Sequence, residues 1–226
     1  MSIKLISTSN QALTTFFGAS TSRSEYQTSE QLAVIDARIA DLPILLEAIR
    51  KGVATYVVGP EEDALLQITR LLSETGAKHL ALVAHGEPGV VHLGGEAIAL
   101  DQLKRRSALL QEWSLETISL YSCNVAQDER FISELEQLTG ARVFGAIGKV
   151  GSAAQGGSWN IEEKPAKSFL DLGAIAAYQH TLAFSNVSIS GAGPDNIFNA
   201  TEAQSVTISG NLSLNTGNGK ILKKMF

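Results

Sequence analysis

Five short apolar runs alternate with segments of helical periodicity over much of the chain, and this alternation is what most constrains the fold. Apolar runs of strand length separated by helical patterns are typical of strand–helix–strand units, in which right-handed crossovers connect parallel strands. The predicted fold class is therefore α/β, with a mostly parallel sheet and helices on both faces. The runs lie at residues 32–36, 54–58, 80–84, 117–121 and 142–146.

Cap and turn residues place the connecting elements. Asp41 can cap a helix over 42–51, Gly76 can end a helix that begins near Glu61, and Asp101 can cap a helix reaching about residue 110. A further helix ends at Gly140. We also expect a hairpin from 90–93 and 97–100, a sixth strand at 158–161 and a closing helix over 169–182.

Composition divides the chain into three parts. Residues 1–31 are rich in Ser, Thr and Gln and are predicted to form a flexible N-terminal arm. Residues 32–182 carry the alternating pattern and are predicted to form the α/β domain. Residues 183–226 change to Ser, Asn, Gly and Thr, with two alternating stretches at 187–190 and 206–209. This last part predicts a short β-rich stub, the start of a truncated repeat region.

Charge and composition limit the classes of partner. The chain has 226 residues, a net charge of −5 and 44% hydrophobic residues, so it can bury a core and offers no basic stripe for nucleic acid. No apolar run approaches the roughly 20 residues that a membrane span needs. A single cysteine excludes a disulfide framework and a Cys-rich zinc site, and the histidines lack ligand spacing. We therefore expect no nucleic acid, no membrane insertion, no metal and no cofactor.

Two residues with catalytic potential follow predicted strands. His85 comes after the run at 80–84 and Cys123 after the run at 117–121. Sites in parallel sheets form at the carboxyl ends of strands, so the two side chains can share one crevice. An imidazole can take the proton of a thiol and make it a nucleophile, and the N–H of Gly86 can bind an oxyanion. The alternatives are a buried structural cysteine and an ordinary hydrogen-bonded histidine.

Several short motifs around these residues occur in an order and spacing found in a known group. The motifs are Val34-Ile35-Asp36, residues 84–89 (AHGEPG), 121–126 (YSCNVA), 138–141 (LTGA) and 156–161 (GGSWNI). Over about residues 32–182 they resemble the caspase, gingipain and legumain group of cysteine peptidases. The resemblance is closest to an N-terminal domain of unknown function in long, repeat-rich bacterial surface and adhesin-like proteins. Ala84 and Ser122 stand where that branch usually has Ser and Gly.

The resemblance implies a fold and a site. The fold is a caspase-like three-layer sandwich, with His85 as the base, Cys123 as the nucleophile, and the backbone of Gly86 and Cys123 at the oxyanion. Asp36 and Tyr121 occupy the regions that form the substrate pocket in this group, and a carboxylate there would favour a basic side chain. A structural turn role for Asp36 is the equal alternative.

The function expected from these residues is that of a cysteine endopeptidase-like, hydrolytic domain. It would act on a peptide or protein substrate, on secreted surface proteins or on its own chain at Lys149 or Lys164. One alternative is a catalytically silent binding or export-associated head module of a large adhesin, and a weaker one is a small-ligand-binding α/β domain. The start of the sequence lacks a signal-peptide core, so we expect secretion or surface display without one, with a cytoplasmic location left open.

Overall fold

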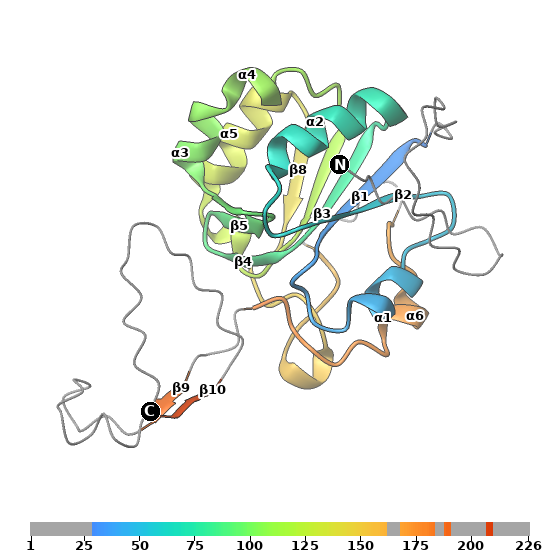
Figure 1. Cartoon of the computed structure of the whole chain (residues 1–226), viewed down its shortest axis with the longest axis vertical. Helices are drawn as coiled ribbons and strands as arrows, with labels where there is room; N and C mark the ends of the chain where they lie inside the picture. Colours follow the sequence, from blue (N-terminus) through green and yellow to red (C-terminus); the bar gives the residue numbers. More distant parts are fainter. Residues whose placement is uncertain (1–28, 162–167, 184–187, 191–206, 210–226) are drawn as a thin grey trace. The chain divides into compact units, whose positions relative to one another are not determined.

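The computed structural model describes residues 29–161, 168–183, 188–190 and 207–209 (Figure 1). The chain divides into two compact units, residues 1–183 and residues 184–226. The predicted arm at 1–31 lies outside the described residues except for its last three, and Gln31 already begins the first strand. The three-part division of the chain stays a prediction.

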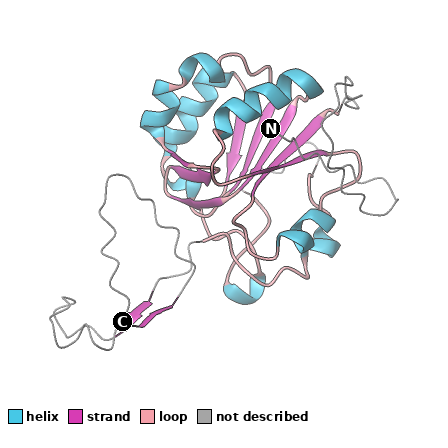
Figure 2. Ribbon diagram, viewed as in Figure 1, coloured by secondary structure: helices cyan, strands magenta, loops and turns pink. Residues whose placement is uncertain are grey.

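A five-stranded parallel sheet forms the centre of the first unit (Figure 2). Its spatial order is β2-β1-β3-β7-β8, so the chain builds outward from β1 in both directions. The predicted α/β class with a mostly parallel sheet is confirmed. The strands are β1 (Gln31–Asp36), β2 (Ala54–Val58), β3 (His79–Val83), β7 (Thr117–Tyr121) and β8 (Arg142–Gly145).

Helices cover both faces of this sheet (Figure 1). Alternate strand residues supply two separate cores: Val34 packs in the core beneath α2 to α5, whereas Ile35 packs in the core that includes residues of α1 and α6. Asp63 and Asp128 cap α2 and α5, and Gly76 and Gly140 end them in the left-handed conformation. The helices are α1 (Leu42–Glu47), α2 (Ala64–Thr75), α3 (Leu100–Arg105), α4 (Ser107–Leu110), α5 (Glu129–Thr139) and α6 (Leu172–Ile175), with single 3₁₀ turns at Val125–Gln127 and Ala153–Gln155.

A small antiparallel sheet of three strands follows β3. It consists of β4 (His85–Glu87), β5 (Val90–Leu93) and β6 (Glu96–Ile98), in the order β4-β5-β6. The expected hairpin is present as β5 and β6, with a second strand that begins and ends earlier than expected. β4 could not be predicted from the sequence, because three residues that include a glycine carry no apolar alternation.

Three predicted elements were wrong. Residues 158–161 form no strand, and of the closing helix over 169–182 only Leu172–Ile175 is helical. The chain leaves the helix there because Thr181 bridges to Gly151, a tertiary contact that overrides local helical preference. The helix expected over 42–51 ends at Glu47, since Ile49 bridges to Leu170.

The second unit shows one pair of short strands among its described residues. β9 (Ser188–Ser190) pairs antiparallel with β10 (Thr207–Ser209). Both strands lie in the alternating stretches noted in the sequence, while most of the predicted stub lies outside the described residues. Within the described parts of the chain, no helix has the length and apolarity needed to cross a membrane.

Candidate functional site

The pairing of β3 with β7 sets the positions of His85 and Cys123. The two strands are parallel neighbours, and Val83 is the Cα partner of Tyr121. The pairing extends one step further, because the N–H of Ala84 donates to the carbonyl of Tyr121 at 3.2 Å. His85 and Cys123 therefore each lie two residues beyond a matched pair, at equivalent places past adjacent strand ends.

Gly86 brings the histidine segment against the cysteine backbone. A Cβ atom at Gly86 would lie 2.6 Å from Cβ of Ser122, 3.0 Å from the carbonyl oxygen of Cys123 and 3.1 Å from its nitrogen. Real Cβ atoms do not approach other atoms so closely, so the contact requires glycine. The two residues expected to bind an oxyanion are thus in backbone contact.

Cys123 is buried and its sulfur is hydrogen-bonded. Sγ accepts a hydrogen bond from the N–H of Val150 at 3.1 Å and donates to the carbonyl of the same residue at 3.6 Å. Burial raises the pKa of the thiol, and the Val150 backbone, the charge of Lys149 and the Leu182 backbone offset part of that rise. The resting sulfur is therefore a protonated thiol that needs a base.

His85 is half-buried and holds one ring nitrogen against a backbone carbonyl. Its Nδ1 lies 3.0 Å from the carbonyl oxygen of Leu182. Burial lowers the pKa of the ring, against the raising effect of this hydrogen bond. A neutral imidazole whose Nδ1 hydrogen bonds to the carbonyl presents Nε2 as its basic atom. His85 and Cys123 thus rest as imidazole and thiol.

Asp36 is fully buried at the end of β1, and both of its carboxylate oxygens are engaged. Oδ1 accepts from the backbone N–H and Nε of Arg38, each at 2.8 Å. Oδ2 accepts from Nη2 of Arg38 and from the N–H of Gly94, also at 2.8 Å each. These bonds favour the turn role that the sequence left open, since they leave the carboxylate no free face for a substrate cation.

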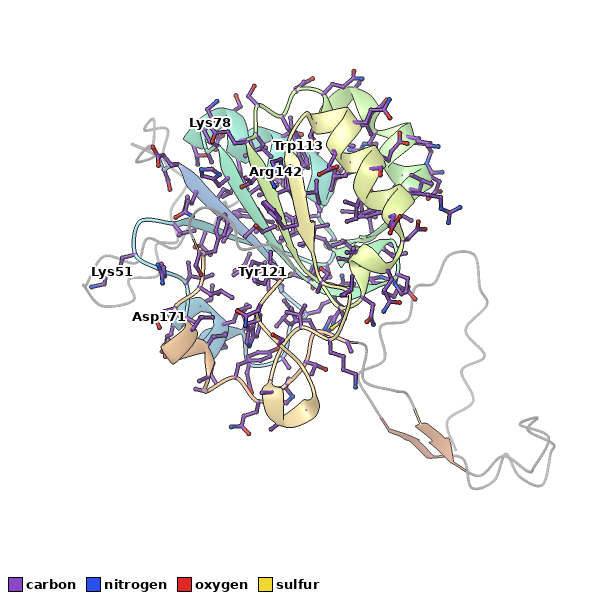
Figure 3. The ribbon with its side chains drawn as sticks, turned by 180° about the vertical axis from the view of Figure 1, so that it is seen from behind. Lys51, Lys78, Trp113, Tyr121, Arg142 and Asp171 are labelled. Carbon is purple, nitrogen blue, oxygen red and sulfur yellow. The ribbon has the colours of Figure 1, made fainter. Side chains whose placement is uncertain are left out.

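Tyr121 lies on the other side of the central sheet from α2 to α5, at the end of β7 and between the sheet and the α6 region in Figure 3. Burial raises its pKa to about 12. It borders a cavity of about 220 Å³, and its ring centroid is 6.4 Å from that of Trp159. The two pocket candidates are therefore separate, because Asp36 does not line this cavity. The other lining residues are Arg50, Asn160, Ile161, Ser168, Leu170 and Leu172.

Residues 32–182 match the family described as a domain of unknown function, DUF4347. The chain belongs to the DUF4347 family. The matched range contains His85, Gly86 and Cys123, and it spans the five-stranded sheet but for Gln31. No curated protein matches the sequence.

The DUF4347 domain ends with a segment that joins the histidine and cysteine segments, a role that the sequence does not indicate. We call residues 180–183 the closing strap. The N–H of Leu182 donates to the carbonyl of Val150 at 2.7 Å, and the N–H of Gly86 donates to the carbonyl of Leu182 at 3.4 Å. Leu182 thereby joins the His-Gly segment to the residue that holds Cys123. No sequence signal could have found a contact between residues 97 positions apart.

Other candidates in the DUF4347 domain have simpler surroundings. Lys149 lies next to Val150, and its positive charge lowers the pKa of the Cys123 thiol. Lys164 lies outside the described residues. Among the residues that the structure describes, no three His, Cys, Asp or Glu side chains gather closely enough to hold a metal ion.

Proposed function

We propose that the DUF4347 domain is a cysteine endopeptidase-like domain in which Cys123 is the nucleophile and His85 the general base. The observation that carries the proposal is the register of β3 and β7, which places both residues at equivalent positions past adjacent strands. The resemblance to the caspase, gingipain and legumain group, drawn from the motifs around these residues, supports the same assignment.

The chemistry follows from the resting protonation states. His85 accepts the thiol proton as Sγ of Cys123 attacks a substrate carbonyl carbon, directly or through one water molecule. The N–H groups of Gly86 and Cys123 stabilise the oxyanion that develops. The proton then passes to the leaving amine, and water hydrolyses the thioester. Because the pKa of His85 is lowered, its ring stays neutral, and able to accept a proton, to a lower pH than an ordinary histidine.

The earlier expectation of cleavage after a basic residue has little support. Asp36 would have to supply the negative charge, but Arg38 already neutralises it and four donors occupy its oxygens. The cavity beside Tyr121 has Arg50 in its lining instead. We therefore propose a peptide or protein substrate, with no preference for a basic residue before the cleaved bond. A secreted or cell-surface setting, on proteins of the adhesin kind, is proposed from the resemblance alone.

A specific observation favours a second candidate, a catalytically silent binding or export-associated module. Cys123 has no exposed surface, and burial raises the pKa of its thiol. A cysteine of this kind packs as a small apolar residue. The two candidates differ in a simple way, because only the peptidase requires substrate to reach the sulfur.

The test is a peptide-library cleavage screen with the full chain. We expect turnover by the wild type, its complete loss in Cys123→Ala, and a loss of at least about 100-fold in His85→Ala, the usual contribution of a general base. His79→Gln is the matched control, because His79 begins the same strand, β3, at the end remote from Cys123. Cleavage that persists in Cys123→Ala, or wild type that cleaves nothing, would overturn the peptidase and favour the silent module.

A further inference from the structure

The carbonyl of Leu182 lies against two groups of the candidate site. Its oxygen accepts a hydrogen bond from the N–H of Gly86 at 3.4 Å, and Gly86 is the residue expected to stabilise the oxyanion. The same oxygen lies 3.0 Å from Nδ1 of His85. A carbonyl held by both groups is polarised in the sense that nucleophilic attack requires.

The N–H of Leu182 is also bonded, to the residue that holds Cys123. This N–H donates to the carbonyl of Val150 at 2.7 Å, and Val150 in turn exchanges hydrogen bonds with Sγ of Cys123. A hydrogen bond from the Leu182 backbone is among the effects that lower the pKa of Cys123. The imidazole and the Gly86 N–H therefore bond to Leu182 of the closing strap, and Val150 joins the sulfur to the same residue.

The strap is fixed in this position by its neighbours. The side chain of Leu182 is fully buried in the core on the α1 and α6 side of the sheet. Thr181 bridges to Gly151, and the N–H of Ser152 donates to the carbonyl of His180 at 2.7 Å. Holding the reacting groups together in this way replaces a bimolecular encounter with an intramolecular one.

We propose that the peptide bond between Leu182 and Ala183 is a substrate of this site, so that the chain cleaves itself at the end of its DUF4347 domain. The inference rests on the proposed peptidase function and names one bond for it. It replaces the earlier candidates Lys149 and Lys164, which were chosen for a basic preference that Asp36 does not support. The family match also ends at Leu182.

The reaction balances with water as co-reactant. His85 takes the thiol proton, and Sγ forms a bond to the carbonyl carbon of Leu182. The bond from that carbon to the nitrogen of Ala183 breaks, and the proton passes to this nitrogen, which becomes a new α-amine. Water then hydrolyses the thioester, which releases the thiol of Cys123 and leaves Leu182 with a carboxylate.

The test follows the intact mass of the purified full chain during incubation at neutral pH. We expect two fragments, one ending at Leu182 and one beginning at Ala183. Cys123→Ala should abolish cleavage and His85→Ala should slow it at least about 100-fold. Ala183→Pro should slow it more than about tenfold, since proline removes the N–H and restricts Leu182 before it. Lys164→Gln is a control that should cleave like the wild type.

The outcomes separate this inference from the proposed function. A chain that stays intact, or breaks at another bond, while it cleaves library peptides in a Cys123-dependent way overturns the Leu182 assignment alone. A chain that does neither overturns both. Cleavage at Leu182 that persists in Cys123→Ala also overturns the assignment, because another protease must then be responsible. Urea unfolding midpoints of each variant show that a loss of cleavage is not a loss of fold.

Discussion

The carboxylate of Asp36 accepts a 2.8 Å hydrogen bond from the N–H of Gly94, across 58 residues of sequence. This bond ties the end of β1 to the turn between β5 and β6. Arg38, which pairs with Asp36, also donates to the carbonyl of His92 at 3.3 Å, and His92 is the strand partner of His85. Asp36 therefore supports the small sheet that carries the candidate base.

Asp36→Ala is expected to destabilise the fold. It removes the bonds that the fully buried carboxylate accepts from Arg38 and from the N–H of Gly94, and leaving the buried N–H unsatisfied typically costs about 2 kcal/mol, while the partly exposed Arg38 keeps water and the carbonyl of His92. Urea unfolding measures the change. Asp101→Ala is the matched control, because its partner Arg105 and Asp101 itself are both exposed, and its midpoint should stay at the wild-type value. An unchanged midpoint for Asp36→Ala would show that the buried carboxylate is dispensable.

Gly86→Ala is expected to displace the histidine segment from Cys123. The new methyl would lie 2.6 Å from Cβ of Ser122, so the backbone must shift. A shift on the order of 1 Å at a reacting centre can cost about 100-fold in rate, and we expect that loss in the library screen.

Gly148→Ala is the control for this substitution. Nothing lies within 4 Å of a Cβ at Gly148, although it too lies near the site, where its carbonyl accepts from the N–H of Asn124. Its activity and unfolding midpoint should match the wild type. Equal activity in the two variants would mean that the close contact at Gly86 has no part in the function.

Ser122→Ala is expected to leave stability unchanged or to raise it by about 1 kcal/mol. The hydroxyl of Ser122 is fully buried and finds no hydrogen-bond partner in the described structure. Removing an unsatisfied buried group removes its desolvation penalty. Thr75→Val provides the contrast, because the Thr75 hydroxyl donates to Leu71 at 2.7 Å and its loss should cost about 1 kcal/mol. A clear destabilisation by Ser122→Ala in urea unfolding would contradict this prediction.

Protonation of His85 is expected to couple stability to pH. Burial lowers the pKa of this ring from its ordinary value of 6.5. Between pH 6.5 and the lower pKa of the folded state, the ring is therefore protonated in the unfolded chain and neutral in the folded chain. Stability should therefore fall as pH drops through 6.5 towards the lower, folded pKa. The urea midpoint should decline less between pH 7.5 and 5.5 in His85→Gln than in the wild type. An equal decline in His85→Gln and the wild type would contradict the lowered pKa of His85. His79→Gln is the control for losing a histidine outside this site.

Much of the fold could be predicted from the sequence, because its strands and longer helices obey local rules. The apolar runs and the glycines at 76 and 140 place the elements to within a few residues. The two expected caps were wrong, because Asp41 makes no side-chain cap bond and Asp101 lies within the first turn of a helix that begins after Ala99. The failures occurred where tertiary contacts outweigh local preference. Residues 176–182 look helical, yet the chain turns at residues 176–177 and the backbone of Leu182 then bonds to Val150.

The candidate site, too, could be predicted only in part. His85 and Cys123 could be placed together from the sequence, because both follow strands and parallel neighbours end at one edge of a sheet. The partners of their side chains could not be, since Val150 and Leu182 contribute backbone groups rather than a recognisable side-chain motif. Asp36 had two equal interpretations, and the bond from Gly94 that favours one of them joins distant parts of the chain.

The register of β3 with β7 has a consequence for how such chains can vary in length. Adding or deleting one residue within either strand would turn His85 or Cys123 toward the opposite face of the sheet, because side chains alternate with a period of two. Between the strands, β5 and β6 form a sheet with the strand of His85, but the short helices from Leu100 to Leu110 lie outside that sheet and can lengthen without moving either residue. Insertions should therefore be tolerated between the two candidate catalytic residues and excluded from the strands that deliver them.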